Sequence, residues 1–291
     1  MATLWDMGGL TWRELAWRVW SQLREDSILG WSAQLSFYFL LSVFPTLFFL
    51  VTLFGYFVGQ GTEMRDALMG YLGALAPEVA TQLIDQIIRQ ITEGASGNKL
   101  VWSLLVALWA GSSGTAAIIS ALNVTYEVKE TRPWWKARLV AVGLMLALVL
   151  LISSALVLLL YGVKLAEAAA SYFGLGGTFS TIWSILRWPL VLAFVLLAFN
   201  LLYLYAPNLK HWDWKWLMPG TVVGVGLWLL ASLGFDFYLS YFNTYDMTYG
   251  SLGTVVVLLL WFYLTGIAIL VGGEVNSEIE RASDKVEQAA N

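Results

Sequence analysis

The sequence predicts an all-α, polytopic membrane protein with six transmembrane helices. Of its 291 residues, 59% are hydrophobic and only 12% are charged, too little charged surface for a water-soluble domain. Six apolar runs are each long enough to cross about 30 Å of hydrocarbon at about 1.5 Å per residue. Lys and Arg residues collect in alternate connecting segments, as in membrane proteins of defined orientation. The fold class follows from these three observations.

The composition also excludes several kinds of site. The chain has no Cys, so disulfides and thiolate metal sites are excluded, and its single His rules out a multi-His metal site. We therefore expect no metal and no cofactor. A formal net charge of -4 makes nucleic acid an unfavourable partner, because phosphate backbones bind clustered Lys and Arg. Nothing in the composition indicates an oligomeric state.

Each apolar run is assigned to one span of a single membrane domain. The predicted spans cover residues 33–58, 99–122, 138–162, 187–206, 217–240 and 251–273. The membrane domain would then comprise residues 33–273, between a cytoplasmic N-terminal segment at 1–32 and a solvated cytoplasmic tail at 274–291. With the N-terminus inside, the inner segments hold eleven of the sixteen Lys and Arg residues. Both termini are therefore predicted to be cytoplasmic.

Two amphipathic regions are predicted outside the spans. Thr11 and Glu14 have the spacing of a capping box, and the apolar residues that follow recur at helical spacing, which predicts a helix lying in the membrane interface. Two short external helices are expected within residues 62–93, the second with Pro77 in its first turn. These external helices either cap the bundle or bind a partner.

Ionisable residues at or within spans are the first functional candidates, because unpaired charges in hydrocarbon are costly. Arg187 stands at the outer start of the fourth span, where it either anchors the helix at the interface or binds a lipid phosphate. Asp236, near the outer end of the fifth span, is its predicted partner. Glu274 either marks the inner end of the sixth span or forms an ion pair that joins helix ends.

Small and polar residues in the first two spans form a second group of candidates. Asn123 with Ser112 and Ser113 gives the second span a polar track, available for interhelical hydrogen bonds or for substrate. Gly111 and Gly114 flank the two serines, and this run permits close packing, unwinding or a cavity at membrane depth. A proline within the first span, Pro45, is predicted to kink it.

Several motifs then occur in a recognisable order. They are Leu35 to Pro45 (LSFYFLLSVFP), Trp109 to Gly114 (WAGSSG), Arg187 to Pro189 (RWP), Tyr249 to Gly253 (YGSLG) and Gly273 to Asn276 (GEVN). In these motifs the chain resembles the YihY/BrkB family. The resemblance implies a six-helix bacterial inner-membrane protein with cytoplasmic termini. It also adds Tyr249 to the expected substrate-binding residues, and Gly250 and Asn276 to the residues expected to act in structure or gating.

The resemblance implies a transporter-like role in handling or translocating lipids or lipid-linked anions, with membrane lipids as partners. The alternative is a non-transporting scaffold that docks a periplasmic or other envelope protein. An old ribonuclease label attached to the family is regarded as a misassignment, and the acidic residues here are scattered between both membrane faces. We therefore expect no enzyme activity.

Overall fold

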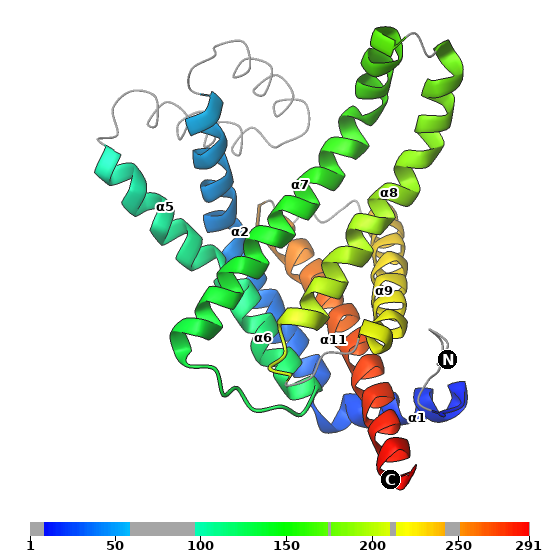
Figure 1. Cartoon of the computed structure of the whole chain (residues 1–291). Coiled ribbons are helices and arrows are strands. Elements are labelled where there is room, and N and C mark those ends of the chain that lie inside the picture. The colour runs from blue at the N-terminus through cyan, green and yellow to red at the C-terminus, as the bar shows by residue number, and fades with distance from the viewer. Residues whose placement is uncertain (1–8, 59–96, 174–175, 210–213, 242–250, 291) are drawn as a thin grey trace. The chain divides into compact units, whose positions relative to one another are not determined.

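The computed structural model is helical through most of the residues it describes, which are 9–58, 97–173, 176–209, 214–241 and 251–290 (Figure 1). In chain order the helices are α1 (Trp12–Glu25), α2 (Ile28–Val58), α5 (Gly97–Gly111), α6 (Ser113–Thr125), α7 (Trp134–Phe173), α8 (Gly176–Tyr205), α9 (Trp214–Tyr241) and α11 (Ser251–Ala290). The predicted all-α class is confirmed. The external helices predicted within residues 62–93 lie outside the described residues.

Within the described residues, five helical segments are long and apolar enough to cross a membrane, and each overlaps a predicted span. These segments are Ile28–Leu50, Leu104–Thr125, Trp134–Leu159, Ile182–Tyr205 and Val255–Ser283. The remaining predicted span, residues 217–240, falls on α9, whose apolar stretch Pro219–Phe235 is shorter. Many large apolar side chains on these helices are exposed, including Leu150 on α7 and Leu230 on α9. Outward-facing apolar surface of this kind is expected of helices that contact lipid.

The chain divides into two compact units, of which the smaller is Tyr38–Gly114. Within it, α2 stays helical on both sides of Pro45, and the kink expected at this residue stays a prediction. The second predicted span is interrupted, because α5 ends at Gly111 and α6 begins at Ser113. A Cβ atom on Gly114 would lie only 2.6 Å from Ser42 Oγ, so this glycine permits a close approach to α2. Of the three expected consequences of the glycine run, close packing and a helix break are present.

The larger unit comprises residues 1–37 and 115–291. In it, α7 and α8 run antiparallel along each other, α9 packs along α11 and against α8, and α1 packs on α11 (Figure 1). This arrangement brings α1 and the last turns of α11 to the same end of the unit (Figure 1). We refer to this end as the α1 end.

The contact between α9 and α11 is built on glycine. A Cβ atom on Gly220 would collide with the carbonyl oxygen of Gly272 and with the side chain of Asn276. Asn276 uses that proximity, since its Oδ1 accepts a hydrogen bond of 2.8 Å from the Gly220 amide. Nearby, the Tyr203 hydroxyl of α8 donates to the carbonyl of Ile269 at 2.9 Å. Small residues thus allow backbone-level packing, as is common between membrane helices.

Helix α11 continues well past the predicted end of the sixth span. It runs unbroken to Ala290, and residues 274–279 are buried. The reason is the contact with α1, where Leu15 and Val19 pack against Val275 and Ile279. The segment expected to be a solvated tail is therefore helical through residue 290, and its first turns belong to the core of the larger unit.

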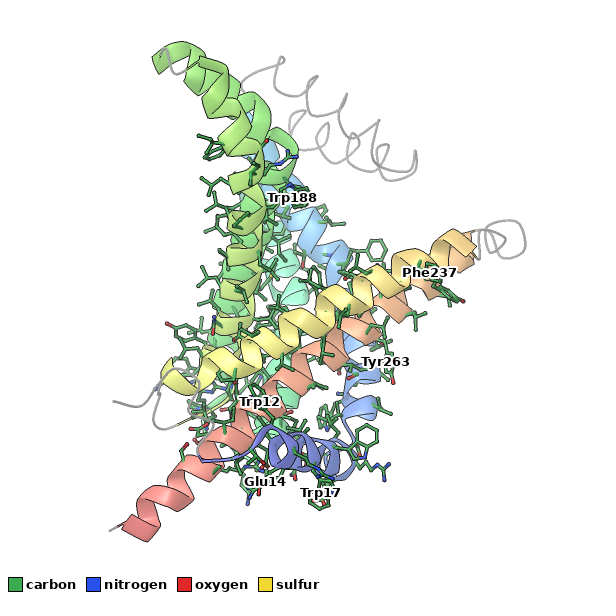
Figure 2. The ribbon with its side chains drawn as sticks, turned by 90° about the vertical axis from the view of Figure 1, so that its right-hand side faces the viewer. Trp12, Glu14, Trp17, Trp188, Phe237 and Tyr263 are labelled. Atoms are coloured by element: carbon green, nitrogen blue, oxygen red, sulfur yellow. The ribbon has the colours of Figure 1, made fainter. Side chains whose placement is uncertain are left out.

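The capping box predicted at the start of α1 is present. Thr11 Oγ1 accepts from the Glu14 amide at 3.3 Å, and the Thr11 amide donates to Glu14 Oε2 at 2.9 Å. The apolar residues of α1 divide between two surfaces, because Leu15 and Val19 are buried on α11 while Trp12 and Trp17 are exposed. Figure 2 shows both tryptophans on α1 where it crosses α11, with Trp17 pointing outward. The helix thus docks on the protein and keeps an aromatic face outside.

Candidate functional site

Arg187 faces α7 from its position on α8. Its Nη1 donates a long hydrogen bond of 3.5 Å to the Leu159 carbonyl, and its guanidinium lies 5.4 Å from the ring centroid of Trp188. Its Nε is buried without a hydrogen-bond partner. The predicted partner, Asp236, lies on α9, but its side chain is outside the part of the structure that is described. The Arg187–Asp236 pair therefore stays a prediction.

A second guanidinium, that of Arg138, lies near the N-terminal end of the candidate span Trp134–Leu159 on α7. Arg138 is in the second turn of α7, and Leu159, beside Arg187, ends that span. The two positions are twenty-one residues apart, which corresponds to about 30 Å along an α-helix. This separation equals the approximate thickness of the hydrocarbon core of a bilayer. Arg187 and Arg138 thus lie near opposite ends of the candidate span of α7.

Arg138 also lines a pocket of about 330 Å³ between α6 and the start of α7. Trp134 and Ala137 of α7 and Ile119 of α6 contribute apolar surface to it. The full lining is Ala116, Ile119, Ser120, Asn123, Glu130, Trp134, Ala137 and Arg138. A cavity with apolar walls and a few charged groups has the character of a site for an amphipathic molecule.

Asn123, predicted to bind substrate, lines this pocket but is also held by the protein. Its Nδ2 donates to Glu130 Oε2 at 3.0 Å, and its Oδ1 accepts from the Asn208 amide at 2.8 Å. Arg132 Nη2 donates to Glu130 at 2.6 Å and to the Ala206 carbonyl at 2.9 Å. The hydrogen bond from the Arg132 side chain lowers the pKa of Glu130 below its ordinary value. The network fixes the α6–α7 loop to the end of α8.

At the α1 end, buried polar atoms gather around Glu274. This residue has no exposed surface, and neither carboxylate oxygen has a hydrogen-bond partner. Thr125 Oγ1, Tyr126 OH and Asn276 Nδ2 are likewise buried and unpartnered. Thr125 and Tyr126 both approach the α11 backbone at Gly273, next to Glu274. Such a concentration of unsatisfied polar atoms is unusual in a folded interior and calls for a functional explanation.

The carboxyl of Asp26 reaches the same place from the end of α1. It lies within hydrogen-bonding reach of the Glu274 carboxyl, and its Oδ2 is buried without a donor. Burial raises the pKa of Asp26 above its ordinary value, and the nearby carboxylate of Glu127 adds to this effect. Burial also raises the pKa of the Tyr126 phenol, so this hydroxyl stays neutral. Two adjacent carboxyls thus share a buried site at the α1 end.

The nearby cations, Arg18 and Arg281, form ion pairs with glutamates other than Glu274, in a ring of polar contacts. Arg281 pairs with Glu127 at 3.0 Å and with Glu278 at 3.1 Å. Arg18 of α1 lies 3.8 Å from Glu278, and Gln22 of α1 donates to Glu127 at 2.8 Å. The ring joins α1, α11 and the segment after α6. The ion pair expected at Glu274 is therefore made by Glu278, one turn further along α11.

Ser112 lies in the smaller unit, where its hydroxyl donates to the Trp109 carbonyl at 2.9 Å, and Ser113 begins α6 there. Tyr249 and Gly250 lie outside the described residues. Within the described residues, no group of three or more His, Asp or Glu side chains is placed to hold a metal ion.

Sequence reasoning missed Asp26 and Arg138. Arg138 is the first residue of the predicted span 138–162, where a basic residue is typical of a cytoplasmic span end and does not by itself indicate a binding site. Asp26 follows the amphipathic helix and resembles an ordinary helix-end residue. The available signal for Arg138 was its place one turn after Trp134, where an arginine can reach a headgroup beside an interfacial aromatic.

Comparison with known proteins identifies the family. The family described as virulence factor BrkB matches residues 19–291, nearly the whole chain. The chain belongs to the BrkB family. As a BrkB-family protein whose described residues include five long apolar segments, it is a multi-pass membrane protein.

Relatives of this BrkB-family chain carry two kinds of name. A ribonuclease-like protein of Bacillus subtilis, YfkH, is 36% identical over 86% of this chain and 89% of its own length. A UPF0761 membrane protein of Ralstonia nicotianae is 30% identical over 86% of this chain, which spans 55% of that relative. Another, of Pseudoalteromonas atlantica, is 25% identical over 88% of this chain and 83% of its own length. No solved structure matches the chain.

Proposed function

We propose that the protein translocates lipids, or lipid-linked and other amphipathic anions, across a bacterial inner membrane. The observation that carries this proposal is the pair of guanidinium groups on the α7–α8 hairpin, Arg138 and Arg187, about one hydrocarbon thickness apart. A guanidinium binds phosphate or carboxylate through two parallel hydrogen bonds, so each arginine suits an anionic headgroup.

The surroundings of the arginines fit both parts of such a molecule, the anionic headgroup and the apolar chains. The pocket at Arg138 joins a charged group to apolar walls, and α7 beyond it exposes Leu146, Leu150 and Leu156 along its length. Acyl chains could stay against this apolar face while the headgroup moved between the arginines. With cytoplasmic termini, Arg138 would serve the inner leaflet and Arg187 the outer leaflet.

The test is headgroup translocation in proteoliposomes that contain fluorescent zwitterionic or anionic lipids. We expect lipid movement by wild type above that of protein-free liposomes. Arg138→Ala and Arg187→Ala should each slow it about tenfold or more, since a hydrogen bond to a charged group contributes about 1.5–3 kcal/mol. Arg187→Lys should retain part of the rate, because it keeps the charge but loses the planar fork.

Lys136→Ala is the matched control. Lys136 is an exposed cation on the same helix, two residues from Arg138, and its ammonium stacks on Trp135 at 5.3 Å. This variant should move lipid at the wild-type rate. An equal loss in Lys136→Ala and Arg138→Ala, or no lipid movement by folded wild type with or without an ion gradient, would overturn the proposal.

The scaffold alternative depends on residues 62–93 and stays a prediction. A pull-down from envelope extracts tests it, because deletion of residues 77–93 should release any partner that docks there. We also propose a non-enzymatic role. The purified protein should leave single-stranded RNA intact under conditions in which its lipid movement is measured.

A further inference from the structure

We propose that Asp26 and Glu274 form a proton-binding site, in which one proton is held between the two buried carboxyls and exchanged with water at the α1 end. The ligand of this site is a proton, and the residues that form it are not those of the proposed lipid path along α7. It rests on the burial, the missing donors and the arrangement of charges around Glu274.

The first step of the argument is the missing donor. Glu274 is fully buried, and with both carboxyls ionised neither of its oxygens, nor Asp26 Oδ2, has a hydrogen-bond donor. A buried carboxylate without a partner is costly, and two adjacent carboxylates repel each other. One proton placed between them turns the pair into a donor and an acceptor.

The second step is the charge that the described residues place around the pair. From α1 and the segment after α6 come Arg18 and Glu127, and from α11 come Glu278 and Arg281. The two arginines are already paired with the two glutamates, so this ring is neutral as a whole. The phenol of Tyr126 is neutral, and Glu280 adds only further negative charge near it. Among the described residues, both arginines of this ring are thus engaged by other carboxylates, and a proton would neutralise Glu274 directly.

The third step is access. Asp26 is only partly buried, while Glu274 is completely buried. Asp26 caps the C-terminal end of α1, where its amide donates to the carbonyls of Gln22 and Arg24. Asp26 is therefore the more accessible member of the pair, and a proton exchanged with water would reach the pair through it.

Infrared spectroscopy of the whole protein in nanodiscs tests the site through the carbonyl stretch of a protonated carboxylic acid. Wild type at neutral pH should show such a band, and it should shift on labelling with carboxyl-13C aspartate or glutamate. Asp26→Asn and Glu274→Gln should each abolish it, because the amide supplies a permanent donor and leaves the remaining carboxyl ionised. The matched control is Glu25→Gln, next to Asp26 but exposed, which should keep the band.

Thermal unfolding across pH gives a second measurement. The folded protein binds this proton more tightly than the unfolded chain, so the stabilisation is present at acidic pH and is lost as pH rises through the titration of the pair. The melting temperature of wild type should fall as the pH rises through this range. The melting temperatures of both amide variants should fall less. A wild-type spectrum without a protonated carboxyl at neutral pH, or a band unchanged in both amide variants, would overturn the proposal.

Discussion

At the scale of single residues, the contact between α9 and α11 depends on the absence of side chains. Gly220→Ala would place a Cβ atom on the Gly272 backbone and the Asn276 side chain, so the helices must separate. Overpacking of this kind costs about 1–3 kcal/mol. We expect a lower melting temperature in detergent or nanodiscs.

Gly226→Ala is the control for that prediction. Gly226 lies on the same helix, but a Cβ atom there would meet no atom within 4 Å. Alanine is also the better helix former by about 0.5–1 kcal/mol. The Gly226 variant should be as stable as wild type or more so. Equal destabilisation by the two substitutions would show that helix propensity, and not the close contact, governs both positions.

At the scale of elements, α1 is held to α11 by a small apolar core. Ile279 is fully buried against Leu15 and Val19 of α1. Ile279→Ala should lower the free energy of unfolding by about 2–5 kcal/mol through the cavity it leaves. Trp17→Ala, on the exposed face of α1, should leave this free energy near the wild-type value. Chemical or thermal unfolding in nanodiscs measures both, and a neutral Ile279→Ala would mean that α1 is not docked.

The clamp between the α6–α7 loop and α8 is the second element-scale contact, and it depends on pH. The hydrogen bond from Arg132 lowers the pKa of Glu130, so its contribution is present above the unfolded value, about 4.3, and is lost as pH falls through the folded value. Glu130→Gln should reduce the melting temperature at pH 7, and the difference from wild type should shrink in acid. A difference that persists unchanged in acid would contradict the assigned role of the charge.

At the scale of the whole molecule, orientation is directly testable because the chain has no native Cys. A Cys at Lys136 should react with a membrane-impermeant maleimide only from the cytoplasmic side, and one at Asp246 only from the periplasmic side. The opposite pattern would reverse the predicted topology. It would then place the Arg138 pocket in the outer leaflet.

A whole-molecule consequence follows if the protein both moves lipid and binds the proton. Lipid movement in proteoliposomes should then respond to an imposed pH gradient in wild type, and Asp26→Asn should lose the response while keeping basal movement. The two proposals fail separately. Gradient-independent movement would leave lipid passage intact, whereas an infrared signal without any movement would leave only the proton site.

Several features could be predicted because they depend only on residues that are close together in the sequence. The capping box of Thr11 and Glu14 and the apolar runs follow from spacing along the chain, whereas the glycine run at Gly111 left a helix break as one of three alternatives. The approach of α9 to α11 depends on Gly220, but a small residue in a membrane helix does not specify which helix it will contact. Asp26 could not be assigned to Glu274, since they are far apart in sequence and meet only because α1 folds onto α11.

By itself, the sequence determined the all-α class, the membrane location and most helix positions, since hydrocarbon thickness and helical rise leave few choices for a long apolar segment. The tertiary structure decided which polar groups are buried together. In the folded chain, Arg187 of α8 contacts the Leu159 carbonyl of α7, and the first turns of the expected tail are buried. The physical reason is that the cost of burying a charge depends on its three-dimensional neighbours, which linear spacing does not specify.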